Sequence, residues 1–503
     1  MNPKNIYQIQ PPDFLKLSNF SPSLKPFLLP SPNQKSGFTI DFKDPEAVRQ
    51  LTCALAKKDF NLKLSLPQDR LCPTIPGRLD YCLWIVDILE VANQTTGSDQ
   101  VEVWGIDIGT GSSAIYVLLL SRLLVRSKFL ATEVDEKSYK SAQSNVELNN
   151  LSSSITIIRS DPSSSSSILP KQAIQTRVSP DVPSFTICNP PFYESESEIL
   201  ELSEKRDGEP SGVCTGAVVE MVTEGGEREF ITRMIRESVE LKLNIRWFTS
   251  LCGKYSTLSE IVKVFKSLNG ENYAINELVQ GQTRRWAFAW SWQDYRLPDG
   301  VSRSLSSDGP RLKSYRQLLP LPNRLTYHLP PSMLHQLDEE GLIQKVSETL
   351  RETPGLTVKA EDYRESQKTS LSGADFVIFG WDIGASSCSW TRRERRIIKS
   401  KSIEDEKTKG ELKGDKSPLI KPRLILSVRF CLVRDNSKTR DEQKVSNKVK
   451  CTIDDGQRDE SFSKKRLRIG SSDEMRIEID WIKGFDRKSF ESFWNYSLKK
   501  IIL

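Results

Sequence analysis

Short apolar runs alternate with amphipathic stretches along the first 300 residues. The apolar runs predict buried strands over residues 103–109, 128–135, 155–159, 185–188 and 245–251, with a last strand of alternating aromatics over 282–292. Apolar residues recur at helical spacing over residues 79–91, 113–125, 137–149, 228–241 and 258–268. Strands that alternate with helices are typical of a parallel sheet with right-handed crossovers. We therefore predict an α/β fold with a mostly parallel central sheet.

The flanking segments have a different character. Residues 1–40 are rich in proline and aromatics, which suggests an extension that wraps a surface, and Asp44 before Pro45 is a good helix start. We expect a domain over 41–296 and a Pro/Ser/Arg-rich linker over 297–326. Residues 327–503 are expected to form an α+β domain. Its predicted helices lie near 332–353 and 487–501, its strands near 375–381, 388–399, 424–433 and 475–482, and its low-complexity insertions at about 400–420 and 435–472.

The charge of the chain is unevenly placed. Residues 1–300 carry 32 Lys and Arg against 36 Asp and Glu, a net charge of −4, whereas residues 301–503 carry 40 against 30, a net charge of +10. An enzyme with an appended module that binds a polyanion would show this division, and so would a solvated lysine-rich tail. The run Lys464–Arg468 similarly fits a nuclear-import signal, a phosphate contact or a solvated stretch.

Several classes of protein are disfavoured by composition. The nine cysteines are scattered without a Cys-x-x-Cys pair, which indicates a reducing compartment rather than a disulfide framework or a zinc site. No apolar signal region begins the chain and no run of 18 apolar residues occurs, so we expect an intracellular protein with no membrane partner. The two histidines, His328 and His335, lie outside the first 300 residues, so a histidine-liganded metal or a Ser-His mechanism is not expected there.

A glycine turn follows the first predicted strand. Asp107, Gly109 and Gly111 belong to a segment in which two glycines allow the backbone to approach a ligand, and Ala114 stands where the dinucleotide fingerprint has a third glycine. An acidic residue that holds ribose hydroxyls is expected at the end of the next strand, where Glu133 lies. An ordinary turn with a surface acid remains the alternative interpretation.

The sequence Asn189-Pro190-Pro191-Phe192 follows the fourth predicted strand and is the more specific motif. The Asn189 side-chain oxygen and the Pro190 carbonyl can accept two hydrogen bonds from one amino group, while Phe192 offers a flat apolar face for a base. Two such acceptors favour a pyramidal nitrogen that can attack a sulfonium methyl group without a histidine base. The pattern is typical of adenine-N6 methyl transfer, and a rigid loop without a ligand is the alternative.

Paired cations and alternating aromatics mark the last predicted strand of this half. Arg284 and Arg285 precede Trp286, Phe288 and further tryptophans at period two. These side chains could form a nucleic-acid surface or fill the core face of the strand. We favour the core for the tryptophans and leave the arginines open.

Taken together, these motifs resemble the methyltransferase-like protein 16 family, the eukaryotic U6 small nuclear RNA adenine-N6 methyltransferases with bacterial relatives that act on 23S ribosomal RNA. The resemblance runs over nearly all of residues 1–295. It is carried by residues 5–14, 41–59, 73–81, 105–111, 131–135, 188–192, 224–230, 246–247 with 253–254, and 280–292. It implies a Rossmann-like class I methyltransferase domain.

The resemblance also assigns roles to individual residues. It implies S-adenosylmethionine as cofactor, with Arg78 at its carboxylate, Gly109 against it and Glu133 on its ribose. Asp107, Gly111 and Asn189 complete the cofactor set, and the adenine-holding set is Asn189, Pro190, Pro191 and Phe192. The extension 1–40 is expected to contact RNA, and the expected RNA-contacting cations are Lys4, Arg284 and Arg285. The C-terminal domain is similar to the family's kinase-associated-1-like RNA-binding module. The implied compartment is the nucleus, or the nucleus and the cytoplasm.

The expected substrate is a structured RNA with an unpaired adenine, U6 small nuclear RNA first, and no metal is expected. Two segments depart from the family: residues 194–209 are acidic where basic residues are common, and a serine run at 163–167 replaces the segment before the fourth strand. Two alternatives remain open. One is protein glutamine N5-methylation, although that class usually has Tyr after the prolines; the other is an inactive RNA-binding protein on the same fold.

Overall fold

The computed structural model divides the chain into two compact units. It describes residues 2–34, 36–94, 102–161, 167–204, 216–281, 283–304, 312–362, 376–391, 393–394, 396, 426–434, 475–484 and 486–503. One unit comprises Met1–Gln293 with Val301–Leu321, and the other comprises Asp294–Gly300 with Pro322–Leu503. The expected linker, 297–326, is thus shared between the two units. The predicted insertions at about 400–420 and 435–472, and Lys464–Arg468, lie outside the described residues.

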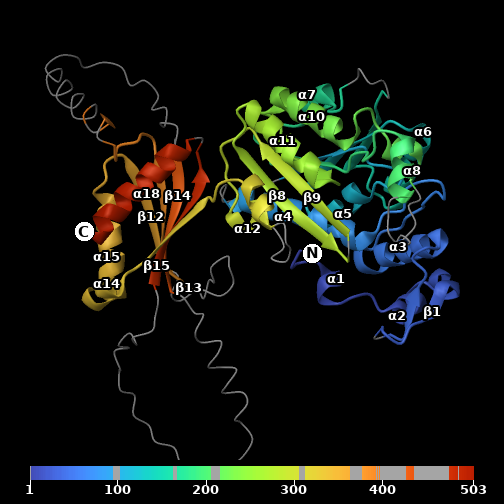
Figure 1. Ribbon diagram of the computed structural model, residues 1–503, viewed down its shortest axis with the longest axis horizontal. Helices are drawn as coiled ribbons and strands as arrows, with labels where there is room; N and C mark the ends of the chain where they lie inside the picture. The colour runs from blue at the N-terminus through green and yellow to red at the C-terminus, as the bar shows by residue number, and fades with distance from the viewer. Residues whose placement is uncertain are drawn as a thin grey trace, which may run out of the picture. The chain divides into compact units, whose positions relative to one another are not determined.

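The first unit, drawn from blue to yellow in Figure 1, is built on a sheet whose first four strands are parallel. Their order is β5-β4-β3-β6, with β3 (Val103–Ile108) in the middle between β4 (Ser127–Glu133) and β6 (Ser184–Cys188). The outer strand β5 (Ile155–Arg159) pairs with β4 in parallel. The predicted parallel sheet is confirmed, and the turns that follow these strands all lie at one edge of it.

The sheet continues through β7 (Phe248–Cys252). A parallel bridge joins Phe185 of β6 to Trp247, and β7 then pairs antiparallel with β9 (Thr283–Ser291). Beyond β9 lies β8 (Asn272–Gln280), an antiparallel strand that the sequence reading missed. The short strand β10 (Arg303–Ser304) pairs with β8.

The helices predicted over 79–91, 113–125, 137–149, 228–241 and 258–268 are confirmed, and further helices are present that the sequence did not predict. The helices of this unit are α3 (Pro45–Phe60), α4 (Ile75–Gln94), α5 (Ile115–Leu123), α6 (Glu136–Leu148), α7 (Lys171–Arg177), α8 (Glu196–Glu204), α9 (Val218–Met221), α10 (Gly226–Ser238), η2 (Val239–Leu241), α11 (Tyr255–Ser267), α12 (Asp299–Ser302) and α13 (Leu312–Leu318). Asp44 caps α3 by accepting a hydrogen bond from the Glu46 amide, as expected. Trp286, Phe288 and Trp290 are buried in the core, so the core interpretation of these aromatics is confirmed.

The N-terminal extension packs on α3 and α4. It contains α1 (Ile6–Ile9), α2 (Phe14–Phe20), η1 (Pro22–Phe27) and the hairpin of β1 (Leu28–Pro30) with β2 (Phe38–Ile40). The fully buried Asn5 amide donates to the Pro76 carbonyl and to Asp80, both in the first turns of α4. The Tyr7 hydroxyl donates to Asp59 at 2.8 Å. The extension is therefore an integral part of the first unit.

The second unit is an antiparallel sheet with helices. The strand order is β11-β15-β14-β13-β12, formed by β11 (Arg324–His328), β15 (Met475–Lys483), β14 (Leu426–Arg434), β13 (Phe376–Ala385) and β12 (Leu356–Asp362). The helices are α14 (Pro331–Gln336), α15 (Glu339–Arg351) and α18 (Arg487–Ile502). Their apolar side chains share one core with the sheet.

Two predictions for the second unit are wrong. The expected helix over 332–353 is divided, because Asp338 begins a new helix by accepting a hydrogen bond from the Gly341 amide. The expected strand over 388–399 begins instead as a turn, closed by a hydrogen bond from the Thr391 amide to the Cys388 carbonyl at 2.9 Å.

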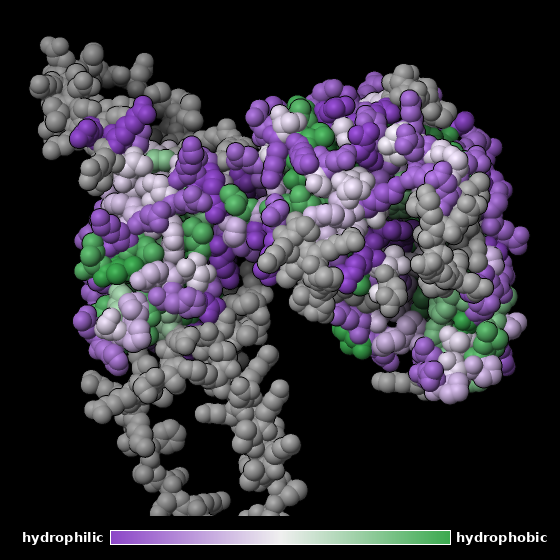
Figure 2. All heavy atoms as spheres, in the orientation of Figure 1, coloured by the Kyte–Doolittle hydropathy of each residue, from purple (hydrophilic) through white to green (hydrophobic). Residues whose placement is uncertain are grey.

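Polar side chains cover much of the visible surface of both units (Figure 2). Among the described helices, none is both long and apolar enough to cross a membrane.

Candidate functional site

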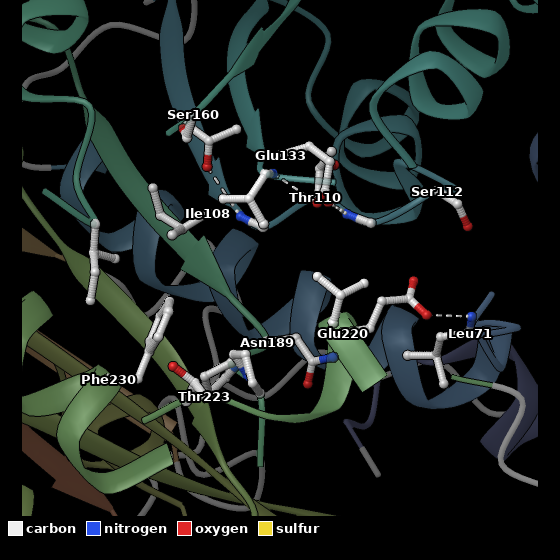
Figure 3. A pocket seen from close by; sticks show the side chains of 18 of the residues that line it. Leu71, Ile108, Thr110, Ser112, Glu133, Ser160, Asn189, Glu220, Thr223 and Phe230 are labelled. Carbon is white, nitrogen blue, oxygen red and sulfur yellow. Dashed lines mark hydrogen bonds between the residues drawn. The ribbon is translucent and has the colours of Figure 1, made fainter. Parts of the chain in front are cut away.

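A cavity of about 400 Å³ lies at the edge of the sheet where β3, β4, β5 and β6 end (Figure 3). Ile108, Thr110, Glu133 and Ser160 line one side of it, and Asn189, Glu220, Thr223 and Phe230 face them from the other side, as Figure 3 shows. Ligands of open parallel sheets bind at this edge, outside the carboxyl ends of the strands. The cavity is therefore the candidate active site.

The glycine turn has the backbone geometry that the sequence predicts. Gly109 and Gly111 have φ values of +69° and +67°, in the left-handed region that favours glycine. A Cβ atom at Gly109 would meet nothing within 4 Å, so this backbone borders open space in the cavity. The Thr110 amide donates to the Thr132 carbonyl at 2.8 Å, which ties the turn to the end of β4. A ligand can approach the main chain closely here.

Glu133 ends β4 and lines the cavity. Its Oε2 accepts from the Gly111 amide at 2.8 Å, and its Oε1 accepts from the amides of Val134 and Asp135 at 2.8 and 2.9 Å. Burial raises the pKa of Glu133, while the three amide donors oppose the rise. A carboxylate oxygen can accept more than one hydrogen bond, so Oε2 retains capacity for a ligand hydroxyl.

Asp107 lies beneath the turn and is fully buried. Its Oδ2 accepts from the Thr110 hydroxyl at 2.7 Å, but its buried Oδ1 has no hydrogen-bond partner among the described residues. Burial raises the pKa of Asp107 to about 7, and the nearby charge of Glu133 adds to the rise. Asp107 thus supports the turn from within the sheet rather than from the cavity lining.

Arg78 reaches the cavity from the first turns of α4. Its NH1 donates to the Tyr116 hydroxyl at 2.8 Å, and its guanidinium carbon lies 5.4 Å from the centre of the Tyr116 ring. The Nε atom is buried and unpartnered within the described part of the chain. An unsatisfied buried guanidinium N–H is costly, so this group suits an anionic ligand such as a carboxylate.

The proline motif forms the opposite wall. Asn189, Pro190 and Pro191 line the cavity, and the buried Asn189 Oδ1 accepts no hydrogen bond from any described residue. Phe192 lies elsewhere: its ring packs against Gly253, and the Arg285 guanidinium carbon lies 5.0 Å from its centre. The structure therefore places Asn189, Pro190 and Pro191 at the cavity and directs the Phe192 ring toward β7 and β9.

A family model described as an RNA methyltransferase matches residues 1–294, the part of the chain that contains this cavity. The chain belongs to this RNA methyltransferase family.

Individual relatives agree with this assignment. The mouse RNA N(6)-adenosine-methyltransferase METTL16 is 37% identical over 314 residues, which cover 62% of this chain but only 55% of the relative, so the chain spans about half the length of that protein. The U6 small nuclear RNA (adenine-(43)-N(6))-methyltransferase of Schizosaccharomyces pombe is 34% identical over 364 residues, covering 72% of this chain and 83% of the relative.

A solved structure is similar as well. The crystal structure of the hMettl16 catalytic domain in complex with MAT2A 3'UTR hairpin 1 has a TM-score of 0.51 and 36% sequence identity, and covers 58% of this chain and 96% of that one. The residues that the family model matches, 1–294, lie almost entirely in the first unit.

The sequence reading missed several residues that line the cavity of this RNA methyltransferase family member. Glu220 of α9 accepts hydrogen bonds from the Leu71 and Ala217 amides, both at 2.9 Å, and burial raises its pKa. Phe230 of α10 stands on the same wall (Figure 3). Phe230 belongs to the block 224–230 that carries the resemblance, but only the fold shows that its side chain borders the cavity.

Two of the three expected RNA-contacting cations pair with acids, and the third, Arg285, lies over the Phe192 ring. Lys4 Nζ pairs with Asp87 at 2.8 Å and with Glu90 at 2.6 Å. Arg284 pairs with the buried carboxylate of Glu277 at 2.8 Å. Lys4 and Arg284 remain partly exposed, with side-chain accessibilities of 49% and 42%, so both can still meet a phosphate. Their role in RNA binding stays a prediction.

Proposed function

We propose that this protein transfers a methyl group from S-adenosylmethionine to the N6 atom of an adenine in structured RNA. The observation that carries the proposal is the buried, unpartnered Asn189 Oδ1 at the wall of a cavity whose opposite wall is the glycine turn. An amide oxygen without a donor suits a substrate that brings its own N–H group.

The cavity fits the cofactor on three counts. The open space at Gly109 admits a ligand against the main chain, Glu133 offers an acceptor for ribose hydroxyls, and the unsatisfied Arg78 Nε suits the carboxylate of the methionine part. When bound, the cofactor supplies an electrophilic methyl group on a sulfonium. This arrangement supports a Rossmann-like class I methyltransferase domain for the first unit.

The chain's own residues orient the nucleophile. Asn189 Oδ1 and the Pro190 carbonyl accept the two amino hydrogens of the adenine, which favours a lone pair on nitrogen over delocalisation into the ring. Proline restricts the backbone on both sides of Pro190, so the carbonyl is fixed before the substrate arrives. The base must leave its stack to reach these acceptors, which is easiest for an unpaired adenine.

We propose U6 small nuclear RNA as the substrate of this chain on the basis of its relatives. The fission yeast relative, most of whose length this chain covers, is named for that activity. We further propose that the second unit is a kinase-associated-1-like module that binds RNA, because residues 301–503 carry a net charge of +10. A nuclear location follows from such a substrate.

The test is methyl transfer from labelled S-adenosylmethionine to U6 RNA made in vitro. Label should enter the wild-type reaction, and both Asn189→Ala and replacement of the target adenine should remove it. If label fails to enter RNA while the cofactor still binds in calorimetry, the substrate assignment is wrong, and a protein glutamine amide is the next acceptor to assay.

A further inference from the structure

A buried carboxylate near the proline motif is not part of the cavity lining. Glu227 lies in the first turn of α10 and is 2% exposed. Its Oε2 accepts from the Gly253 amide at 2.6 Å and its Oε1 from the Lys254 amide at 2.9 Å. These two amides follow β7 directly and precede α11, where no side-chain cap is present. Glu227 therefore fixes the main chain at the end of β7.

Gly253 transmits this constraint to the proline motif. A Cβ atom on Gly253 would lie 2.9 Å from Cδ1 and 3.2 Å from Cε1 of Phe192, so the Gly253 backbone lies flush against the Phe192 ring. The same Cβ atom would lie 3.0 Å from Glu227 Oε2. Any other residue at position 253 would push the carboxylate and the ring apart. The Arg285 guanidinium, 5.0 Å from the ring centre, provides a further contact to Phe192.

The start of α10 also contacts the residues after Phe192. A Cβ atom on Gly226, which has a φ of +62°, would lie 3.5 Å from the Glu194 amide nitrogen. The Tyr193 amide donates to the Met221 carbonyl at 2.9 Å, and the Thr223 amide donates to the Tyr193 carbonyl at 3.0 Å. The residues that follow Phe192 are thus held by the segment 221–226, which directly precedes Glu227.

We propose that Glu227 is a positioning residue for methyl transfer: through Gly253 it fixes Phe192, and with it the orientation of the Asn189 and Pro190 acceptors. This inference rests on the proposed function. It requires a carboxylate, because each of the two amides donates to a different oxygen of Glu227, so both oxygens must be acceptors. Glutamine has the same shape but one oxygen, and its amino group would face a main-chain N–H.

A purely structural role is the competing explanation, because a negative charge in the first turn of a helix is favourable in itself. The two roles differ in kinetics. Misplaced acceptors lower kcat, and a displacement of about 1 Å can reduce a rate by about a hundredfold. Loss of fold stability instead reduces the active fraction, and it changes neither the affinity of the folded protein nor its response to a second substitution in Phe192.

The experiment uses the full chain with U6 RNA and S-adenosylmethionine. Glu227→Gln should lower kcat, counted per cofactor-binding site from the calorimetric stoichiometry, by about tenfold to a hundredfold, while the cofactor Kd and the RNA KM stay within about twofold of wild type. A kcat per binding site equal to that of the wild type would show a purely structural role. Glu229→Gln is the matched control, because it is the same change two residues along α10 at a partly exposed ion pair with Arg236. Full kcat in Glu227→Gln overturns the inference.

A double-mutant cycle tests the route through the ring. In a protein that already carries Phe192→Leu, Glu227→Gln should lower kcat by less than about threefold, since the residue through which Glu227 acts is already altered. Independent, multiplicative losses overturn the inference. If Glu227→Gln fails to fold, Gly253→Ala takes its place: it should fold and show the same loss of kcat, and full activity overturns the inference. A wild-type protein that methylates no RNA overturns the proposed function itself, and this inference with it.

Discussion

Replacing Asp107 by Asn should flatten the dependence of stability on pH. The pKa of the Asp107 carboxyl is about 7 in the folded protein against an ordinary value of 3.8. Between these values the folded state holds a proton that the unfolded state has released, so the free energy of unfolding falls as pH rises through this window. From about pH 5.5 to about pH 8 this single group accounts for a loss of about 2 kcal/mol.

Urea denaturation of the wild-type chain and of Asp107→Asn at the two pH values measures the effect. Glu133 and Glu220, whose pKa values are also raised by burial, add a slope of the same sign in both proteins, so the difference between the slopes isolates Asp107. Asp181→Asn, at an exposed turn, is the matched control and should leave the slope unchanged. Equal slopes in the wild type and Asp107→Asn would refute the reasoning.

Further substitutions separate binding from stability. Gly109→Ala should lower the free energy of unfolding by about 1 kcal/mol, because φ at this position is +69°. It should also weaken cofactor binding by more than tenfold, because the new methyl group enters the cavity. An unchanged cofactor Kd in calorimetry would contradict this. Arg78→Met should weaken cofactor binding by about 1.5–3 kcal/mol, the usual range for a hydrogen bond to a charged group, while thermal melting shifts little. Deleting residues 322–503 should weaken RNA binding and reduce its salt dependence, and an unchanged salt slope would show that the basic unit does not contact RNA.

The central strands could be predicted because each combines a clear pattern with a chemical marker at its end. β3, β4 and β6 are short buried runs that end in the glycine turn, in Glu133 and in Asn189. β8 was missed because it is buried on both faces yet contains Asn272, Asn276 and Glu277. Such a strand lacks the alternation of polar and apolar residues that marks a half-exposed strand.

The part of the site that the sequence did not predict depends on contacts between residues that lie far apart in the chain. Glu220 lines the cavity only because a bridge between Tyr193 and Val222 brings α9 beside the proline motif. The Phe192 ring packs against Gly253, some 60 residues later in the chain, so closely that a Cβ atom on Gly253 would lie 2.9 Å from Cδ1 of the ring. Local spacing carries no signal for either arrangement. Motif chemistry predicted the acceptors, and tertiary packing determined which side chains face the cavity.

The central claim is that the cavity methylates the exocyclic nitrogen of adenine. In the most direct test, U6 RNA is incubated with the wild-type protein and S-adenosylmethionine and then digested to nucleosides. The methylated nucleoside is identified by mass spectrometry against authentic standards. N6-methyladenosine is expected in the wild-type reaction, and none is expected with Asn189→Ala, whose side chain lacks the acceptor oxygen. Methyl groups on a ring nitrogen or a ribose hydroxyl, or N6-methyladenosine formed equally well by Asn189→Ala, would contradict it.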